Sequence, residues 1–116
     1  MNGLPTLIRE QREAERAELD IRVEADNPWF QGHFPRFAIL PGVVQIGWAE
    51  HFVRERYAFG PALRALEQVK FKRPILPGTE LTLVLKPDLA AEKVRYEYRG
   101  AETSYSGGVL CFGTGP

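Results

Sequence analysis

The chain has 116 residues, of which 44% are hydrophobic and 26% are charged, so a single globular domain (residues 1–116) is expected rather than a disordered segment. Its 15 Lys and Arg residues balance 15 Asp and Glu residues, and the formal net charge of zero gives no reason to expect nucleic acid or an anionic membrane as a partner. The single cysteine excludes an internal disulfide, and with only two histidines a Cys/His zinc site is not expected.

Two strands are predicted before the centre of the chain. Thr6–Glu13 is short and polar and predicts a weak strand, whereas Ala17–Ala25 alternates apolar and charged residues, the pattern of a half-buried antiparallel strand. Asp26-Asn27-Pro28 ends this strand. The segment from Trp29 to Leu40 has no steady period and is expected to form a structured loop.

A long helix is predicted to begin at Pro41-Gly42 and to stop at Phe59-Gly60-Pro61. Its start is apolar over most of the circumference, so we expect other structure to wrap it. The apolar positions are Val43, Ile46, Ala49, Val53 and Tyr57, widened by Val44, Trp48 and Phe52.

The remainder reads as four strands joined by short turns, which predicts an antiparallel meander. On the first of them, Glu67 is an exception on the expected inner face, and the Gly107-Gly108 pair on the last predicts a bulge or a close backbone approach. With only one helix available, the sheet of about six strands must curl around it, which defines an α+β domain. The four strands span Leu63–Lys72, Leu81–Lys86, Lys93–Arg99 and Thr103–Phe112.

The candidate chemistry lies between the second strand and the helix. His33 follows Gly32, which admits a close backbone, and precedes Phe34-Pro35, which shields the ring from water, so a neutral imidazole there is suited to take a proton near pH 7. The N–H groups of Gly42 and Val43 begin the helix without intrahelical acceptors and could stabilise charge on a carbonyl oxygen. A loop histidine with one hydrogen bond and an ordinary Pro-Gly helix start are the alternatives.

Two blocks carry a family resemblance. Gly32-His33-Phe34-Pro35 with Pro41-Gly42-Val43, and Val69–Pro74 with Pro77-Gly78, closely resemble motifs of bacterial (3R)-3-hydroxyacyl-acyl-carrier-protein dehydratases. The residues from Phe37 to Trp48 are most similar to the branch associated with aryl-polyene pigment synthesis. The resemblance implies a hot-dog fold and dehydration of (3R)-3-hydroxyacyl thioesters to trans-2-enoyl thioesters in fatty-acid or polyene-type biosynthesis.

The resemblance also assigns roles. His33 would act on the C2 proton, the Gly42 and Val43 amides would receive the thioester carbonyl, and the substrate would also meet Phe34, Pro41 and Gly47. No metal or organic cofactor is implied, because the phosphopantetheine arm of acyl carrier protein carries the substrate. Acyl carrier protein is the implied partner, and the implied assembly is a homodimer or a heterodimer with a homologue.

One position departs from the family. Its second catalytic group is a Glu or Asp supplied by the partner protomer, and counting from Pro41 that position is Gly47, which has no side chain to exchange a proton. Glu50 and His51, three and four residues later on the same helical face, are candidate substitutes, although both could be ordinary solvated or paired residues. Three functions follow: an active dehydratase, a catalytically degenerate subunit that pairs with an active homologue or binds acyl chains, and, fitting least, an acyl thioesterase.

The remaining expectations concern surfaces and location. Lys70, Lys72 and Arg73, together with Arg36, would form a basic rim for the phosphopantetheine phosphate and the acidic carrier protein, or else a solvated strand face. Cys111 is expected to be a small buried hydrophobe. No run of 18 apolar residues and no signal-peptide pattern occurs, so a cytoplasmic protein is expected. Core or interface positions are expected for Trp29, Trp48, Tyr96 and Tyr98.

Overall fold

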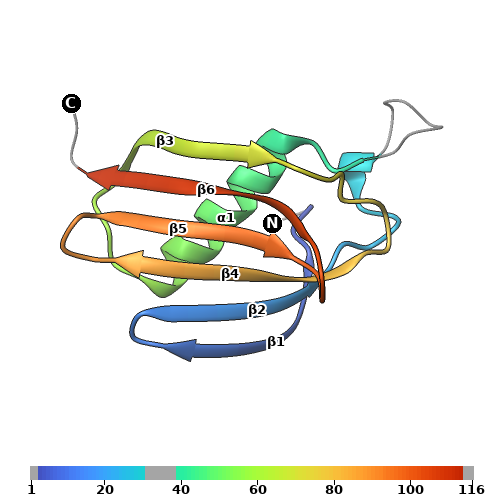
Figure 1. Cartoon of the computed structure of the whole chain (residues 1–116), viewed down its shortest axis with the longest axis horizontal. Coiled ribbons are helices and arrows are strands. Elements are labelled where there is room, and N and C mark those ends of the chain that lie inside the picture. Colours follow the sequence, from blue (N-terminus) through green and yellow to red (C-terminus); the bar gives the residue numbers. More distant parts are fainter. Residues whose placement is uncertain (1–2, 31–38, 114–116) are drawn as a thin grey trace.

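A computed structural model describes residues 3–30 and 39–113 of the chain. Six antiparallel strands form one curled sheet, and a single long helix, α1 (Gly42–Arg56), crosses its inner face (Figure 1). This confirms the predicted α+β architecture. A short 3₁₀ turn, η1 (Pro28–Phe30), follows the second strand. The strands are β1 (Thr6–Glu13), β2 (Arg16–Arg22), β3 (Ala62–Phe71), β4 (Glu80–Asp88), β5 (Lys93–Arg99) and β6 (Ser104–Gly113).

The order of the strands corrects the predicted meander. The sheet runs β1-β2-β4-β5-β6-β3, so β4, β5 and β6 do form a meander, but β3 pairs with β6 and not with β4. The reason is that β2 occupies the edge of β4 that a β3 hairpin would need. Consequently β3 lies at one edge of the sheet, next to the start of α1 (Figure 1).

The apolar alternation of β2 builds the core as predicted. Ala17, Leu19 and Ile21 are fully buried and lie opposite Leu85, Leu83 and Leu81 of β4. This inner layer packs against one side of α1. Trp48, Tyr96, Tyr98 and Cys111 are also buried, as expected, whereas Trp29 is 47% exposed.

The curled sheet wraps one side of α1, as expected, and among the described residues part of the opposite side of the helix start stays exposed. The buried positions of the helix are Val44, Gln45, Trp48, Ala49, Phe52 and Val53. By contrast, Val43 is 77% exposed and Gly47 is exposed as well. The helix ends at Arg56 because Tyr57 adopts an extended conformation. Among the described residues, no helix has the length and apolar character required to cross a bilayer.

Two register irregularities in β3 bear on a second correction, the position of Glu67. Gln68 adopts φ = 54°, in the left-handed region, and the register with β6 shifts between Glu67 and Lys70. An earlier register shift, between Leu63 and Ala65, takes Glu67 off the inner face. Its carboxylate is exposed and pairs with Lys93 at 3.2 Å. At Gly107 the close-approach alternative holds, because an added Cβ would lie 2.9 Å from the Tyr96 carbonyl oxygen.

An ion pair ties the β1–β2 hairpin to the end of α1. The Arg56 guanidinium donates to both carboxylate oxygens of Glu10, each at 2.7 Å, and the Arg56 side chain is 8% exposed. Hydrogen bonding from Arg56 lowers the pKa of the Glu10 carboxyl below its ordinary value. The stabilisation is therefore complete above the unfolded-state pKa of about 4.3 and is lost as the pH falls through the lower folded-state pKa.

We expect Glu10→Gln to reduce the free energy of unfolding at pH 7 by about 1.5–3 kcal/mol, the usual contribution of hydrogen bonds to charged groups. The difference from wild type should shrink below pH 4. Urea unfolding at pH 7 and at pH 3.5 measures both values. Glu13→Gln, an exposed change on the same strand, is the matched control. A difference that is unchanged at pH 3.5 would contradict this account.

Candidate active site

The start of α1 opens into a pocket that brings several of the sequence-predicted residues together. This helix-start pocket has a volume of about 370 Å³ and is lined by Ile39, Leu40, Gly42, Gln45, Phe71, Lys72, Arg73 and Pro74. It therefore unites Gly42, expected to hold a carbonyl oxygen, with two residues of the expected basic rim. Pro41 precedes the pocket and caps the helix with its own carbonyl, which accepts from the N–H groups of Val44 and Gln45 at 3.1 and 3.2 Å.

The first N–H groups of the helix remain free for a ligand as far as the described residues show. No described residue accepts a hydrogen bond from the backbone of Gly42 or Val43. A side chain at position 42 would clash, because an added Cβ would lie 2.7 Å from the Phe71 ring. The Phe71 side chain, itself 53% exposed, thus forms one wall of the pocket directly against the helix start.

Beneath this helix start lies a buried polar network that the sequence reasoning missed. Gln45, 3% exposed, accepts a hydrogen bond from the Ser106 hydroxyl at 2.5 Å and donates to the Leu40 carbonyl at 3.1 Å. The Tyr98 hydroxyl donates to the Gln45 carbonyl at 2.6 Å. Burial raises the pKa of the Tyr98 phenol well above its ordinary value, so this donor keeps its proton. The available signal was a lone glutamine within an apolar helix start.

A second pocket lies beside the side-chain-free position of the helix. This Gly47 pocket has a volume of about 240 Å³ and is mostly apolar. A Cβ added at Gly47 would meet nothing within 4 Å, so there is room for a larger residue. The lining residues are Gly3, Leu4, Trp29, Val43, Val44, Gly47, Trp48 and His51.

The two candidate substitutes for the missing acid are both paired along the helix. The Glu50 carboxylate accepts from Arg54 at 2.9 Å and does not line the Gly47 pocket. His51 does line it, but its Nε2 lies 3.3 Å from the Glu55 carboxylate. Their pairing is the ordinary helical alternative considered from the sequence, and neither side chain is held toward the empty position by a described contact.

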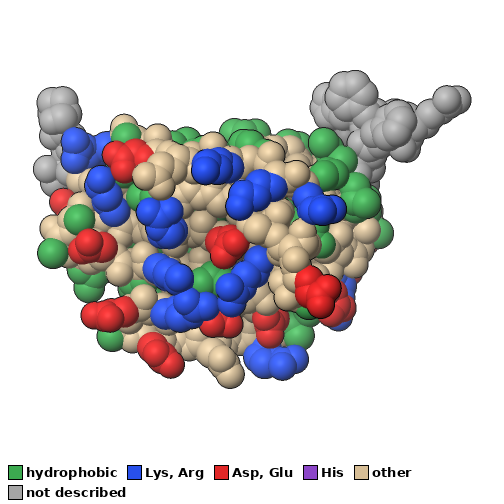
Figure 2. All heavy atoms as spheres, in the orientation of Figure 1, with side chains coloured by type: hydrophobic (Ala, Val, Ile, Leu, Met, Phe, Trp, Pro, Cys, Tyr) green, Lys and Arg blue, Asp and Glu red, His purple; other side chains and the backbone are tan. Residues whose placement is uncertain are grey.

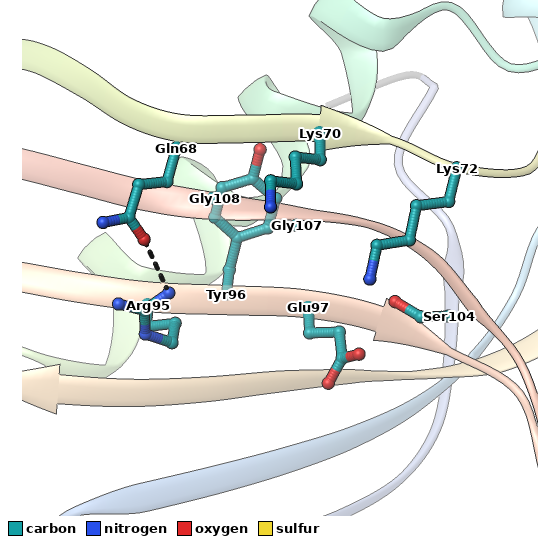
Figure 3. A pocket seen from close by; sticks show the side chains of 9 residues that line it. All are labelled: Gln68, Lys70, Lys72, Arg95, Tyr96, Glu97, Ser104, Gly107 and Gly108. Atoms are coloured by element: carbon teal, nitrogen blue, oxygen red, sulfur yellow. Dashed lines mark hydrogen bonds between the residues drawn. The ribbon is translucent and has the colours of Figure 1, made fainter.

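The expected basic rim is split between two surfaces. Lys70 and Lys72 line a groove of about 280 Å³ on the outer face of the sheet, where Lys70 lies near Gly107 and Lys72 lies beside Ser104 (Figure 3). Lys72 also lines the helix-start pocket, as Arg73 does, whereas Lys70 does not. Basic side chains spread widely over this outer face (Figure 2). Lys72 and Arg73 are therefore the residues of the rim that adjoin the helix start.

Some predicted residues lie outside the described part of the chain. His33, Phe34 and Arg36 belong to residues 31–38, so their roles stay predictions. Within residues 3–30 and 39–113, no group of three or more His, Cys, Asp or Glu side chains is arranged to share a metal ion. The expectation of a site without a cofactor likewise stays a prediction.

Curated relatives that match this chain are 3-hydroxyacyl-[acyl-carrier-protein] dehydratases. The 3-hydroxyacyl-[acyl-carrier-protein] dehydratase FabZ of Caldicellulosiruptor bescii is 30% identical over 113 residues, covering 91% of this chain and 79% of that protein. FabZ of Staphylococcus aureus is 36% identical over 83 residues, covering 66% of this chain and 57% of that protein.

Solved structures confirm the expected hot-dog fold. A structure described as the dehydratase heterocomplex ApeI:P from Xenorhabdus doucetiae superposes with a TM-score of 0.86 and 30% identity, covering 93% of this chain and 96% of that chain. An uncharacterized protein from Erwinia carotovora subsp. atroseptica gives a TM-score of 0.80 at 31% identity, covering 95% and 96%. The family model described as ApeI dehydratase (ApeI-like) matches residues 9–109. The chain therefore belongs to the ApeI-like dehydratase family.

Proposed function

We propose that this chain is a subunit of an enzyme that dehydrates (3R)-3-hydroxyacyl thioesters on acyl carrier protein to trans-2-enoyl thioesters. A proton leaves C2, the C3–O bond breaks, a double bond forms between C2 and C3, and the hydroxyl leaves as water once it has gained a proton. The observation that carries the proposal is the helix-start pocket, where the Gly42 N–H, which no described residue accepts, adjoins Lys72 and Arg73.

The proposed roles follow from this chemistry. His33 takes the C2 proton, and the Gly42 and Val43 amides hold the thioester oxygen while enolate charge develops on it. The positive end of the α1 dipole adds to this stabilisation. Lys72 and Arg73 face the phosphate of the phosphopantetheine arm and the acidic carrier protein. No metal or further cofactor takes part in these steps.

The leaving hydroxyl needs an acid, and Gly47 favours a partner subunit as its source. In a homodimer of this chain, both sites would lack a carboxylate at the helical position where the family has one. In a heterodimer with a homologue carrying Asp or Glu there, the partner's acid completes the site that uses His33. The relative described as a dehydratase heterocomplex is a precedent for such pairing.

The open edge of β3 is the proposed joining surface. This edge strand is ten residues long and leaves backbone hydrogen-bonding groups unpaired, which suits addition of a partner strand. Leu66 and Phe71 on it are 42% and 53% exposed. The opposite edge, β1, is dominated by charged and polar side chains, which oppose such pairing. The proposed compartment is the cytoplasm, where the lone thiol of Cys111 stays reduced.

The test is an assay for the conjugated enoyl thioester formed from a (3R)-3-hydroxyacyl carrier-protein substrate. The chain is assayed alone and after co-expression with a hot-dog homologue that carries the carboxylate, and native mass spectrometry gives the subunit composition. Activity in the heterodimer alone supports the partner-dependent form of the proposal. Activity of the homodimer supports the self-sufficient form. Absence of dehydration in both preparations refutes the dehydratase proposal.

Removing the two cations beside the pocket should weaken substrate capture. We expect Lys72→Ala combined with Arg73→Ala to raise KM for the carrier-protein thioester by about 2- to 30-fold, with little change in kcat, because exposed ion pairs contribute little each. Steady-state kinetics at low and high salt measure the effect, which should shrink in high salt. Lys86→Ala, an exposed lysine of β4, is the control. Equal KM values for the double variant and the control would contradict the assignment.

A further inference from the structure

Gln45 is the polar side chain of the helix start to which the proposed chemistry assigns no role. Its carboxamide has a defined orientation, because the Leu40 carbonyl can only accept and the Ser106 hydroxyl lies 2.5 Å from the other carboxamide atom. Ser106 is 1% exposed and Gln45 3% exposed, so neither group can exchange its partner for water. Breaking the pair would leave buried polar groups unsatisfied.

The contacts of Gln45 reach both sides of Gly42 and Val43. On the preceding side, Gln45 Nε2 holds the Leu40 carbonyl at 3.1 Å, while the Leu40 N–H donates to the Ile75 carbonyl at 2.8 Å. On the following side, the Gln45 N–H donates to Pro41 and its carbonyl accepts from Tyr98. Gly42 and Val43, whose N–H groups have no acceptor among the described residues, are therefore a short span fixed at both ends.

The anchors of this span come from the sheet. Tyr98 belongs to β5 and Ser106 to β6, two adjacent strands that each have a neighbour on both sides, so the first turn of α1 is fastened to the interior of the sheet. Both anchors are fully or almost fully buried. An apolar side chain at position 45 could fill the same volume but could make neither hydrogen bond of the carboxamide.

We propose that Gln45 is a positioning residue that fixes the Gly42 and Val43 N–H groups in the direction needed to hold the thioester oxygen. This rests on the proposed function in one respect, the assignment of those N–H groups to the thioester carbonyl. The stabilisation of a developing oxyanion depends on preorganised donors, and small misplacements are costly. Gln45 acts through the backbone amides and does not touch the reacting atoms.

The kinetic test uses variants that separate positioning from folding. Gln45→Met keeps the length of the side chain and removes its hydrogen bonds; we expect kcat to fall about 10- to 100-fold with KM changed less than about 3-fold. Ser106→Ala removes only one anchor and should give a smaller loss in the same parameter. Gln11→Met makes the same chemical change at an exposed position of β1 and should match wild type.

A pH profile supplies a rescue that a purely structural role would not give. In Gln45→Glu, a protonated carboxyl can donate to Leu40 and accept from Ser106 as the carboxamide does, whereas the ionised form loses the donor. Its kcat should therefore approach that of wild type at acidic pH and fall as the pH rises, relative to wild type at each pH. A profile parallel to that of wild type would overturn the proposal.

A measurement without substrate keeps this inference distinct from the proposed function. Residual dipolar couplings report the directions of the Gly42 and Val43 N–H bonds. In Gln45→Met we expect these couplings to change while those of the last two turns of α1 stay as in wild type. Unchanged couplings together with unchanged kcat would overturn the positioning role. An inactive wild-type heterodimer with altered couplings in the variant would instead refute the proposed function and leave the positioning role supported.

Discussion

Replacing His33 by alanine in the heterodimer is expected to reduce kcat for dehydration by about 10²- to 10⁴-fold, the range typical of losing a general base. The other histidine of the chain, His51, does not offer a free replacement, since its Nε2 lies 3.3 Å from the Glu55 carboxylate. KM should change little, because the backbone amides and the basic residues that hold the thioester are retained. The rate of enoyl-thioester formation, measured under single-turnover conditions, isolates the chemical step.

The control for this experiment lies in the partner. Changing the equivalent histidine of the homologue should leave most activity intact, because the site that uses it faces Gly47 and lacks an acid. His33→Gln, which retains polarity without basicity at neutral pH, should be as inactive as His33→Ala. If the partner's histidine proves essential and His33 does not, the assignment of the productive site is wrong. Thermal unfolding of each variant shows whether the complex is intact.

The second large effect is a gain of activity. Gly47→Asp should raise dehydration by the chain without a partner by at least about 10²-fold, because it restores a proton-transfer group to both sites of a homodimer. Space is available, since a Cβ at this position meets nothing within 4 Å and the adjoining pocket holds about 240 Å³. The helix should tolerate the change, since glycine within a helix is less favourable than most residues by a few tenths to 1 kcal/mol.

Two further replacements of Gly47, one smaller than aspartate and one of the same shape, separate acid catalysis from helix stabilisation. Gly47→Ala should raise stability by about 0.5–1 kcal/mol without a gain in rate. Gly47→Asn has the shape of aspartate without its proton-transfer capacity and should also stay inactive. A wild-type homodimer that already dehydrates quickly, with no further gain in Gly47→Asp, would mean that Glu50 or His51 supplies the acid. Glu50→Gln and His51→Gln would then identify which of them does.

The sequence predicted those parts of the fold that short-range patterns determine. The period-two alternation of β2 correctly placed Leu19 and Ile21 in the core, and the Pro41-Gly42 pair correctly marked the helix start. The position of β3 could not be read in this way. Which strand it joins depends on β2 having taken the edge of β4, a contact between segments about 60 residues apart.

The site shows the same division. The motif around Pro41-Gly42 drew attention to free N–H groups, and the fold then placed Lys72 and Arg73 beside them. The role of Gln45 depends on Ser106 and Tyr98, which only the sheet register brings beneath the helix. The exposure of Val43 was also hidden, because a helix start that is apolar on most sides carries no polar face to indicate its orientation.

Phe71 lies where the proposed subunit interface and the proposed thioester pocket meet. Its ring stands at the end of the edge strand proposed to meet the partner, and it also forms the wall of the pocket against Gly42. Thermodynamic linkage makes any such coupling reciprocal: if subunit association changes the affinity for the thioester, thioester binding must change the affinity between subunits by the same factor. Under such coupling through Phe71, the population of assembled enzyme would respond to the supply of its own substrate.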